Sequence, residues 1–162
     1  MRFWEYPKNY VWNEMLYDIP TDTTARFLAE LGNSNHLDID YSTTGSSAKN
    51  TIYDNVLRDF GYNASREKYD YRKVENELYA GRPVMLSGTN PNGGGHVWVC
   101  DGLQIINNVT SSALLLHMNW GWGGNHDGYY QFNNWTYVND KNETVTYTPN
   151  LLHRMFINIY PK

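Results

Sequence analysis

The stretch His117-Met118-Asn119-Trp120-Gly121-Trp122-Gly123-Gly124 ends an apolar run and then turns the chain on closely spaced glycines. The segment Asp127-Gly128-Tyr129-Tyr130 follows and returns to an extended pattern. Glycine has no Cβ and accepts the backbone conformations that a tight turn requires. The two segments therefore predict antiparallel strands joined by a glycine-rich turn, with an Asn-Trp pair at the end of the first strand.

A second stretch, Gly93-Gly94-Gly95-His96-Val97-Trp98-Val99, lies upstream of this turn. Its glycines would let a peptide backbone approach the His96 imidazole at the start of a strand. An Asn amide oxygen can accept a hydrogen bond from the far ring N–H of a catalytic histidine, and an indole can shield that bond from water. We therefore expect the His96 strand to lie beside the strand that ends at Asn119-Trp120. The glycine triplet alone also fits a flexible loop before a core histidine, and the later glycines fit an ordinary hairpin.

The chain reads as helical in its first half and rich in strands in its second half. Helices are predicted over residues 21–32, 46–61 and 70–83. Their expected N-terminal caps are, in order, a side chain among Thr21–Thr24, Ser46 or Ser47, and Asp70, and their expected ends are a left-handed Gly32, Gly61, and Gly81 with Pro83. One face of the second helix is expected to carry Ile52, Val56, Leu57 and Phe60. Strands are predicted over residues 83–87, 96–106, 113–120, 129–133 and 152–160. These elements predict one α+β domain over residues 1–162, in which an antiparallel sheet packs against about three helices.

Composition narrows the classes of function. The formal charge is -4, from 13 basic and 17 acidic residues that are scattered along the chain, which argues against nucleic-acid and membrane partners. The chain is rich in aromatic residues, with 14 Tyr and 6 Trp, a composition that suits clefts and interfaces. Residues 1–12 show no signal-peptide pattern, and no stretch is apolar enough to span a membrane.

Cys100 is the single cysteine of the chain. A thiol peptidase needs an imidazole within hydrogen-bond reach of its cysteine, so that a thiolate–imidazolium pair can form. Cys100 follows His96 by four positions in a predicted strand, which separates the two residues by roughly 13 Å. We therefore expect no dyad between them, and we expect Cys100 to be a buried and unreactive thiol.

A metal site is a further alternative, since five residues with ligand side chains occur in this part of the chain: His96, Cys100, His117, His126 and Asp127. Strand spacing separates the first two too widely for joint chelation, and the sequence contains no Cys-x-x-Cys or His-Glu-x-x-His pattern. We therefore predict neither a metal nor another cofactor. His126 and Asp127 are expected simply to end a turn.

The combined pattern of Gly-Gly-His96, the Asn119-Trp120-Gly121-Trp122 segment and Asp127-Gly128-Tyr129-Tyr130 resembles the streptopain family of bacterial papain-like cysteine peptidases. The resemblance covers nearly the whole chain from about Tyr10. It implies a partial papain-like fold, with His96 as the general base and Asn119 and Trp120 as its support. It also implies that Gly94, Gly95, Gly121 and Trp122 bind substrate.

The nucleophilic cysteine segment of that family precedes the stretch that resembles Tyr10–Asn13, and it is absent from this sequence. The resemblance therefore implies part of a cysteine endopeptidase whose nucleophile lies outside this chain, and a chain that is inactive alone. The implied partners are a peptide or protein substrate and a Cys-bearing segment, from the same precursor or from a second chain. The implied location is secreted, periplasmic or at the cell surface. The alternative is a noncatalytic binding or regulatory module, derived from a peptidase, with an aromatic-lined cleft.

Overall fold

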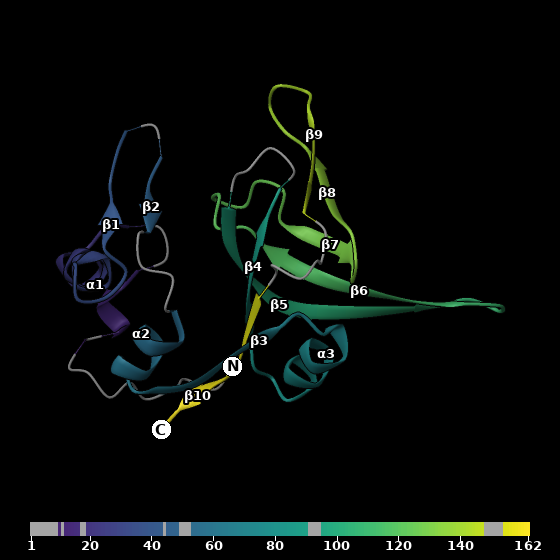
Figure 1. Ribbon diagram of the computed structural model, residues 1–162, viewed down its shortest axis with the longest axis horizontal. Coiled ribbons are helices and arrows are strands. Elements are labelled where there is room, and N and C mark those ends of the chain that lie inside the picture. The colour runs from purple at the N-terminus through teal and green to yellow at the C-terminus, as the bar shows by residue number, and fades with distance from the viewer. Residues whose placement is uncertain are drawn as a thin grey trace. The chain divides into compact units, whose positions relative to one another are not determined.

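The computed structural model describes residues 10, 12–16, 19–43, 45–48, 53–90, 95–147 and 154–162. Its architecture is α+β, as predicted, with three α-helices and a largely antiparallel main sheet among these residues (Figure 1). The chain forms two compact units, Met1–Ala64 with Tyr160–Lys162 and Ser65–Ile159. The prediction of a single domain stays a prediction. No helix among the described residues is long and apolar enough to cross a membrane.

The first unit contains helices α1 (Asp22–Gly32) and α2 (Tyr53–Asp59). Thr21 caps α1 as predicted, since its side chain accepts a hydrogen bond from the Thr24 N–H. The predicted left-handed C-cap at Gly32 is wrong. Gly32 belongs to the helix, and Asn33 follows in an extended conformation. A Cβ at Gly32 would meet the Tyr41 hydroxyl, which is the far end of an exposed side chain.

The predicted caps of the second helix are also wrong. Ser47 lies in a two-residue strand, β2 (Ser47–Ala48), which pairs with β1 (Ile39–Asp40), and α2 is described only from Tyr53. Ser47 is therefore extended and paired where a cap was expected. Predicted core position Ile52 lies outside the described residues. Gly61 follows the end of α2 with a φ of 82°, as its predicted role requires. A short 3-10 helix, η1 (Trp12–Glu14), precedes α1.

The main sheet has the strand order β3-β10-β4-β5-β6-β7. Its strands are β3 (Tyr62–Lys68), β4 (Val84–Thr89), β5 (Gly95–Asn107), β6 (Ser112–Asn119), β7 (Gly128–Gln131) and β10 (Arg154–Pro161). The five predicted strands correspond to β4, β5, β6, β7 and β10, with boundary shifts of one or two residues at the ends that the structure describes. Strand β3 and a separate hairpin, β8 (Trp135–Val138) with β9 (Thr144–Tyr147), were not predicted.

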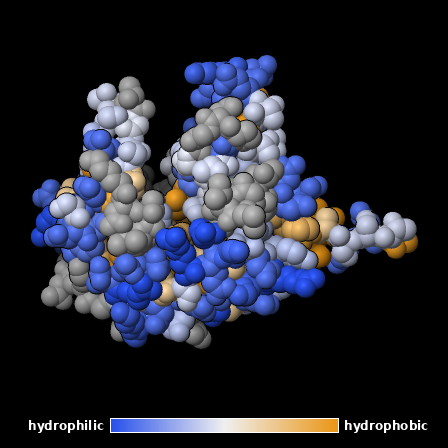
Figure 2. Space-filling view, in the orientation of Figure 1, coloured by the Kyte–Doolittle hydropathy of each residue, from blue (hydrophilic) through white to orange (hydrophobic). Residues whose placement is uncertain are grey.

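Helix α3 (Tyr71–Tyr79) packs against β4 and β5. Its N-cap is Asp70, whose side chain accepts from the Arg72 N–H, and Gly81 follows the helix with a φ of 73°, both as predicted. Strands β5 and β6 continue beyond the ends of their neighbours β4 and β7 as a two-stranded ribbon (Figure 1). Hydrophobic colour lies along this ribbon in Figure 2, and Ile105, Ile106 and Val109 are exposed there.

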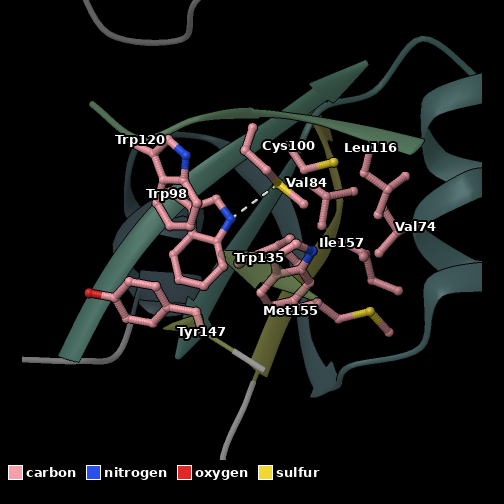
Figure 3. Packing of buried hydrophobic residues seen from close by; sticks show 12 residues of the cluster. Val74, Val84, Trp98, Cys100, Leu116, Trp120, Trp135, Tyr147, Met155 and Ile157 are labelled. Atoms are coloured by element: carbon pink, nitrogen blue, oxygen red, sulfur yellow. Dashed lines mark hydrogen bonds between the residues drawn. The ribbon is translucent and has the colours of Figure 1, made fainter. Parts of the chain in front are cut away.

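The core of the second unit combines inward side chains of the main sheet with Val74 of α3 and with Trp135 and Tyr147 of the β8–β9 hairpin (Figure 3). Its members are Val74, Val84, Leu86, Trp98, Cys100, Leu116, Met118, Trp120, Trp135, Tyr147, Met155 and Ile157. Three tryptophans and a tyrosine form its aromatic end, where the Trp98 indole N–H donates to the Met118 sulfur at 3.3 Å. The predicted functional residues His96 and Trp120 lie at this aromatic end.

Candidate active site

Strands β5 and β6 are antiparallel neighbours, with Val99 opposite Asn119 and Cys100 opposite Met118. This pairing confirms the prediction that the His96 strand lies beside the strand ending at Asn119-Trp120. His96 is the second residue of β5 and is paired with Gly88 of β4, three residues before the pairing of β5 with β6 begins at Val99. The histidine is therefore held by β4 on one side, and on the other side it lies beyond the last pair of β5 and β6, where the chain continues from Asn119 to Trp120.

His96 and Trp120 lie on the same face of the sheet. Side chains alternate along a strand, so His96 shares a face with the buried Trp98 and Cys100. The imidazole stacks on Trp122 at 4.7 Å between ring centroids and lies 6.0 Å from the ring of Trp120, with interplanar angles of 27° and 18°. The predicted position of the imidazole beside the indole is confirmed. Trp120 is fully buried, and Trp122 is partly exposed above it.

A backbone carbonyl orients the imidazole. His96 Nε2 lies 2.8 Å from the carbonyl oxygen of Trp120. A carbonyl oxygen only accepts, so the neutral ring must carry its proton on Nε2 and keep its lone pair on Nδ1. Among the described residues, Nδ1 has no hydrogen-bond partner. The ring is thus prepared to receive a proton at Nδ1.

Burial sets the charge of this ring. Desolvation lowers the pKa of His96 below its ordinary value of 6.5, and the hydrogen bond to the Trp120 carbonyl opposes part of that shift. The imidazole is therefore neutral near neutral pH, which is the state that a general base requires before it takes a proton.

The turn after β6 fixes the main chain around Trp120. Gly121, Gly123 and Gly124 have positive φ values of 75°, 64° and 88°, which glycine adopts without strain. The Trp120 N–H donates to the Asp127 carboxylate at 2.8 Å, and the Gly121 N–H donates to Asn119 Oδ1 at 3.0 Å. Side chains on both sides of the turn therefore hold the residue that binds His96.

The structure gives Asn119 a partner that differs from the expected one. Its amide oxygen accepts from the Gly121 N–H, and its side chain is exposed. Alternation explains the difference, because Met118 and Trp120 point into the core and Asn119 between them must point away. The group that the sequence did not reveal is the Trp120 carbonyl. Strict alternation along β6 was the available signal that Asn119 and His96 lie on opposite faces.

Of the three glycines predicted to bind substrate, the structure describes Gly95 and Gly121. Gly94 lies outside the described residues. Gly95 begins β5 opposite Thr89, and a Cβ there would meet only the Gly88 carbonyl at 3.9 Å, an ordinary contact. Gly121 faces open space but needs its positive φ. The assignment of Gly94, Gly95, Gly121 and Trp122 to substrate binding stays a prediction.

Aromatic residues from the β8–β9 hairpin join the site and were not predicted as part of it. Tyr137 lies 5.4 Å from Trp122 and 4.5 Å from His126 between ring centroids. Tyr147 lies 6.4 Å from His96. These residues come from strands that the sequence pattern did not reveal, so their approach to His96 could not be foreseen. Tyr137 and Tyr147 together form an aromatic wall, in which Tyr137 contacts Trp122 and Tyr147 lies near the imidazole.

Cys100 is fully buried, as predicted. Strand pairing runs without interruption from His96 opposite Gly88 to Cys100 opposite Val84. The strand is therefore extended, which keeps the two residues roughly 13 Å apart, and Trp98 lies between them on the same face. Desolvation by burial, with a smaller contribution from the charge of Asp101, raises the pKa of the Cys100 thiol to about 12. Cys100 is not placed to act with His96.

His117 and Asp101 form a second polar pair on the opposite face of β5 and β6. His117 Nδ1 lies 2.6 Å from Asp101 Oδ1, and the Tyr129 ring meets the imidazole edge-on at 5.1 Å. A β-bulge between Cys100 and Gly102 allows Asp101 to reach this position. No group of three or more His, Cys, Asp and Glu side chains among the described residues is arranged to hold a metal ion.

Comparison with known proteins identifies the relatives of this chain. The model of the peptidase C10 family matches residues 4–130, more than half of the chain. Streptopain of Streptococcus pyogenes and streptopain of its serotype M1 are each 28% identical over 155 residues, which covers 80% of this chain. The chain spans 36% of the length of these curated relatives. The chain belongs to the peptidase C10 family.

Proposed function

We propose that this chain is the histidine-bearing part of a bacterial cysteine endopeptidase, with His96 as the general base and the nucleophilic cysteine outside these 162 residues. The observation that carries the proposal is the hydrogen bond from His96 Nε2–H to the Trp120 carbonyl, which leaves Nδ1 free to take a proton. Membership of the peptidase C10 family supports the reaction class.

In this proposal, Nδ1 of His96 takes the proton of the thiol, and the thiolate attacks the carbonyl carbon of the peptide bond. The tetrahedral intermediate collapses as the C–N bond breaks, and the imidazolium returns the proton to the leaving amine. Water then hydrolyses the acyl-enzyme, with His96 again as the base. The aromatic wall around Trp122 would contact the substrate chain, and the backbone near Gly94, Gly95 and Gly121 would lie beside it.

The remaining parts of the proposal concern partners and location. The substrate is a peptide or protein. The Cys-bearing segment comes from the same precursor or from a second chain, and the reaction needs no cofactor. By family resemblance, the protein acts outside the cell, in the periplasm or at the cell surface.

A noncatalytic module that binds peptides is the second candidate. Two observations favour it: the cluster of aromatic rings around Trp122, and a single cysteine that is buried away from His96. Such a module would keep the aromatic surface for binding and have no use for the Nδ1 lone pair.

The test uses the complete protein encoded by the gene, assayed with casein and fluorogenic peptides. We expect turnover that a thiol reagent abolishes, and a loss of about 100- to 10,000-fold for His96→Ala because the general base is removed. Cys100→Ala and the outer-face variant His117→Ala are the matched controls and should stay within about two-fold of wild type. Absence of turnover in the complete protein, with peptide binding retained, would favour the binding module. Loss of activity in Cys100→Ala alone would contradict the proposed location of the nucleophile.

A further inference from the structure

Two peptide groups flank Trp120, and a side chain holds each of them. The Asp127 carboxylate accepts the N–H of the peptide between residues 119 and 120, at 2.8 Å. The Asn119 amide oxygen accepts the N–H of the peptide between residues 120 and 121, at 3.0 Å. Both side chains leave the Trp120 carbonyl free for His96, whose Nε2 lies 2.8 Å away.

Strand pairing does not supply an acceptor for the Trp120 N–H, and Asp127 does. The ladder between β6 and β7 ends where Met118 lies opposite Gly128, and the positive φ values of Gly121 and His126 then turn the chain out of register. The Trp120 N–H follows that last pair and has no strand partner. A buried N–H without an acceptor is destabilising, so the carboxylate stabilises this geometry as well as defining it.

The geometry of a peptide group explains how Asn119 acts at a distance. The carbonyl and the N–H of a trans peptide are coplanar and point in opposite directions. Asn119 lies on the exposed face and binds the Gly121 N–H there, so the Trp120 carbonyl of the same peptide must point to the face that carries His96. The amide therefore orients the histidine through the peptide plane and without touching the ring.

We propose that Asp127 and Asn119 are positioning residues that fix the two peptide planes around Trp120, so that the Trp120 carbonyl selects the Nε2–H form of His96. The catalytic meaning of this arrangement rests on the proposed function. The arrangement itself concerns only which ring nitrogen carries the proton. It can therefore be tested without a thiol or a substrate.

The experiment is ¹⁵N NMR of the His96 side chain in the full 162-residue chain above its pKa. We expect the Nε2–H tautomer to dominate in the wild type. Asp127→Ala and Asn119→Ala should each lower the ratio of the Nε2–H to the Nδ1–H tautomer by about ten-fold, the factor that one ordinary hydrogen bond supplies. Asp127→Asn and Asn119→Asp keep an acceptor oxygen and should restore the ratio. Asp101→Ala removes a carboxylate from the opposite face and is the matched control.

A wild-type ratio in a folded Asp127→Ala or Asn119→Ala variant would overturn the role of that residue. If an alanine variant does not fold, hydrogen exchange of the wild-type protein decides the question. The Trp120 and Gly121 amides should then be protected, and exchange at the rate of a free amide would overturn the proposal. A failed peptidase assay with the predicted tautomer ratios would reject the proposed function and leave this inference intact.

Discussion

His96 and His117 lie on the same pair of strands but on opposite faces, and their partners differ in kind. The His96 ring is half-buried among tryptophans and binds a neutral carbonyl. The His117 ring is 30% exposed and binds the carboxylate of Asp101, which is 41% exposed. An Asp-His pair is the arrangement that usually suggests catalysis, yet here it belongs to the histidine that faces away from the aromatic cluster.

The face of the sheet decides which histidine lies neutral beside the aromatic cluster. A carbonyl partner on the inner face orients the ring without adding a charge, and burial keeps the ring neutral. On the outer face, solvent reaches both members of the pair, and an exposed pair of this kind contributes little stability, about 0–1 kcal/mol.

The largest effect that separates the two faces should be the reactivity of a thiol. Burial raises the pKa of Cys100 from 9.0 to about 12, which lowers its thiolate fraction by about a thousand-fold at pH 8. Maleimide should therefore label native Cys100 at least a thousand-fold more slowly than the denatured chain. Asp101→Cys places a thiol one position further along, on the outer face, and should label rapidly. Fast labelling of native wild-type protein would contradict the inner-face assignment.

Truncation of aromatic side chains should give the next largest difference. Trp120 is fully buried, and Trp120→Ala should cost about 3–5 kcal/mol of unfolding free energy. Tyr129 on the outer face is 52% exposed, and Tyr129→Ala should cost about 1 kcal/mol or less. Urea denaturation monitored by circular dichroism measures both changes. Equal losses would show that the outer face is as well packed as the inner face.

Acidification should give the smallest effect. The pKa of His96 is lower in the folded chain than its ordinary 6.5, so the unfolded chain binds more protons as the pH falls below that value. Stability should be greatest above about pH 6.5 and fall towards the folded pKa, with a slope of at most about 1.4 kcal/mol per pH unit from this group. The change in slope between wild type and His96→Gln isolates the contribution. A His96→Gln variant with an unchanged slope would show that the ring is not desolvated.

Local patterns predicted part of this structure from the sequence. Thr21 and Asp70 cap helices as expected, because an N-cap requires only nearby backbone N–H groups. Strands β5 and β6 were predicted from apolar runs and a polar turn. Gly32 was misassigned because the helix continues through it and Asn33 then follows in an extended conformation, so this helix end uses no left-handed residue at Gly32. Ser47 was misassigned because pairing with Asp40 overrides its capping tendency.

The candidate site shows the same limit. The proximity of His96 and Trp120 followed from strand pairing, which the motif spacing implied. The partner of His96 did not follow, because it is a backbone atom and any residue type can supply one. Tyr137 and Tyr147 were missed because their hairpin has short strands and a polar turn, a pattern that also fits a loop. Backbone acceptors and long-range aromatic contacts are therefore what the structure adds.

The bulge at Asp101 changes which residues of β5 face the core. Before it, even-numbered residues such as Trp98 face the core, and after it the core positions are odd-numbered, as at Leu103 opposite the buried Leu116. One extra residue thus shifts the alternation of inward and outward side chains by one position along the strand. Deletion of Asp101 would remove the extra residue, so that Cys100 and Gly102 become consecutive partners of Met118 and His117 in a regular ladder, and the carboxylate that binds His117 would be lost. At any other position of this strand, a change of length by one residue would turn the inward side chains beyond it to the outer face.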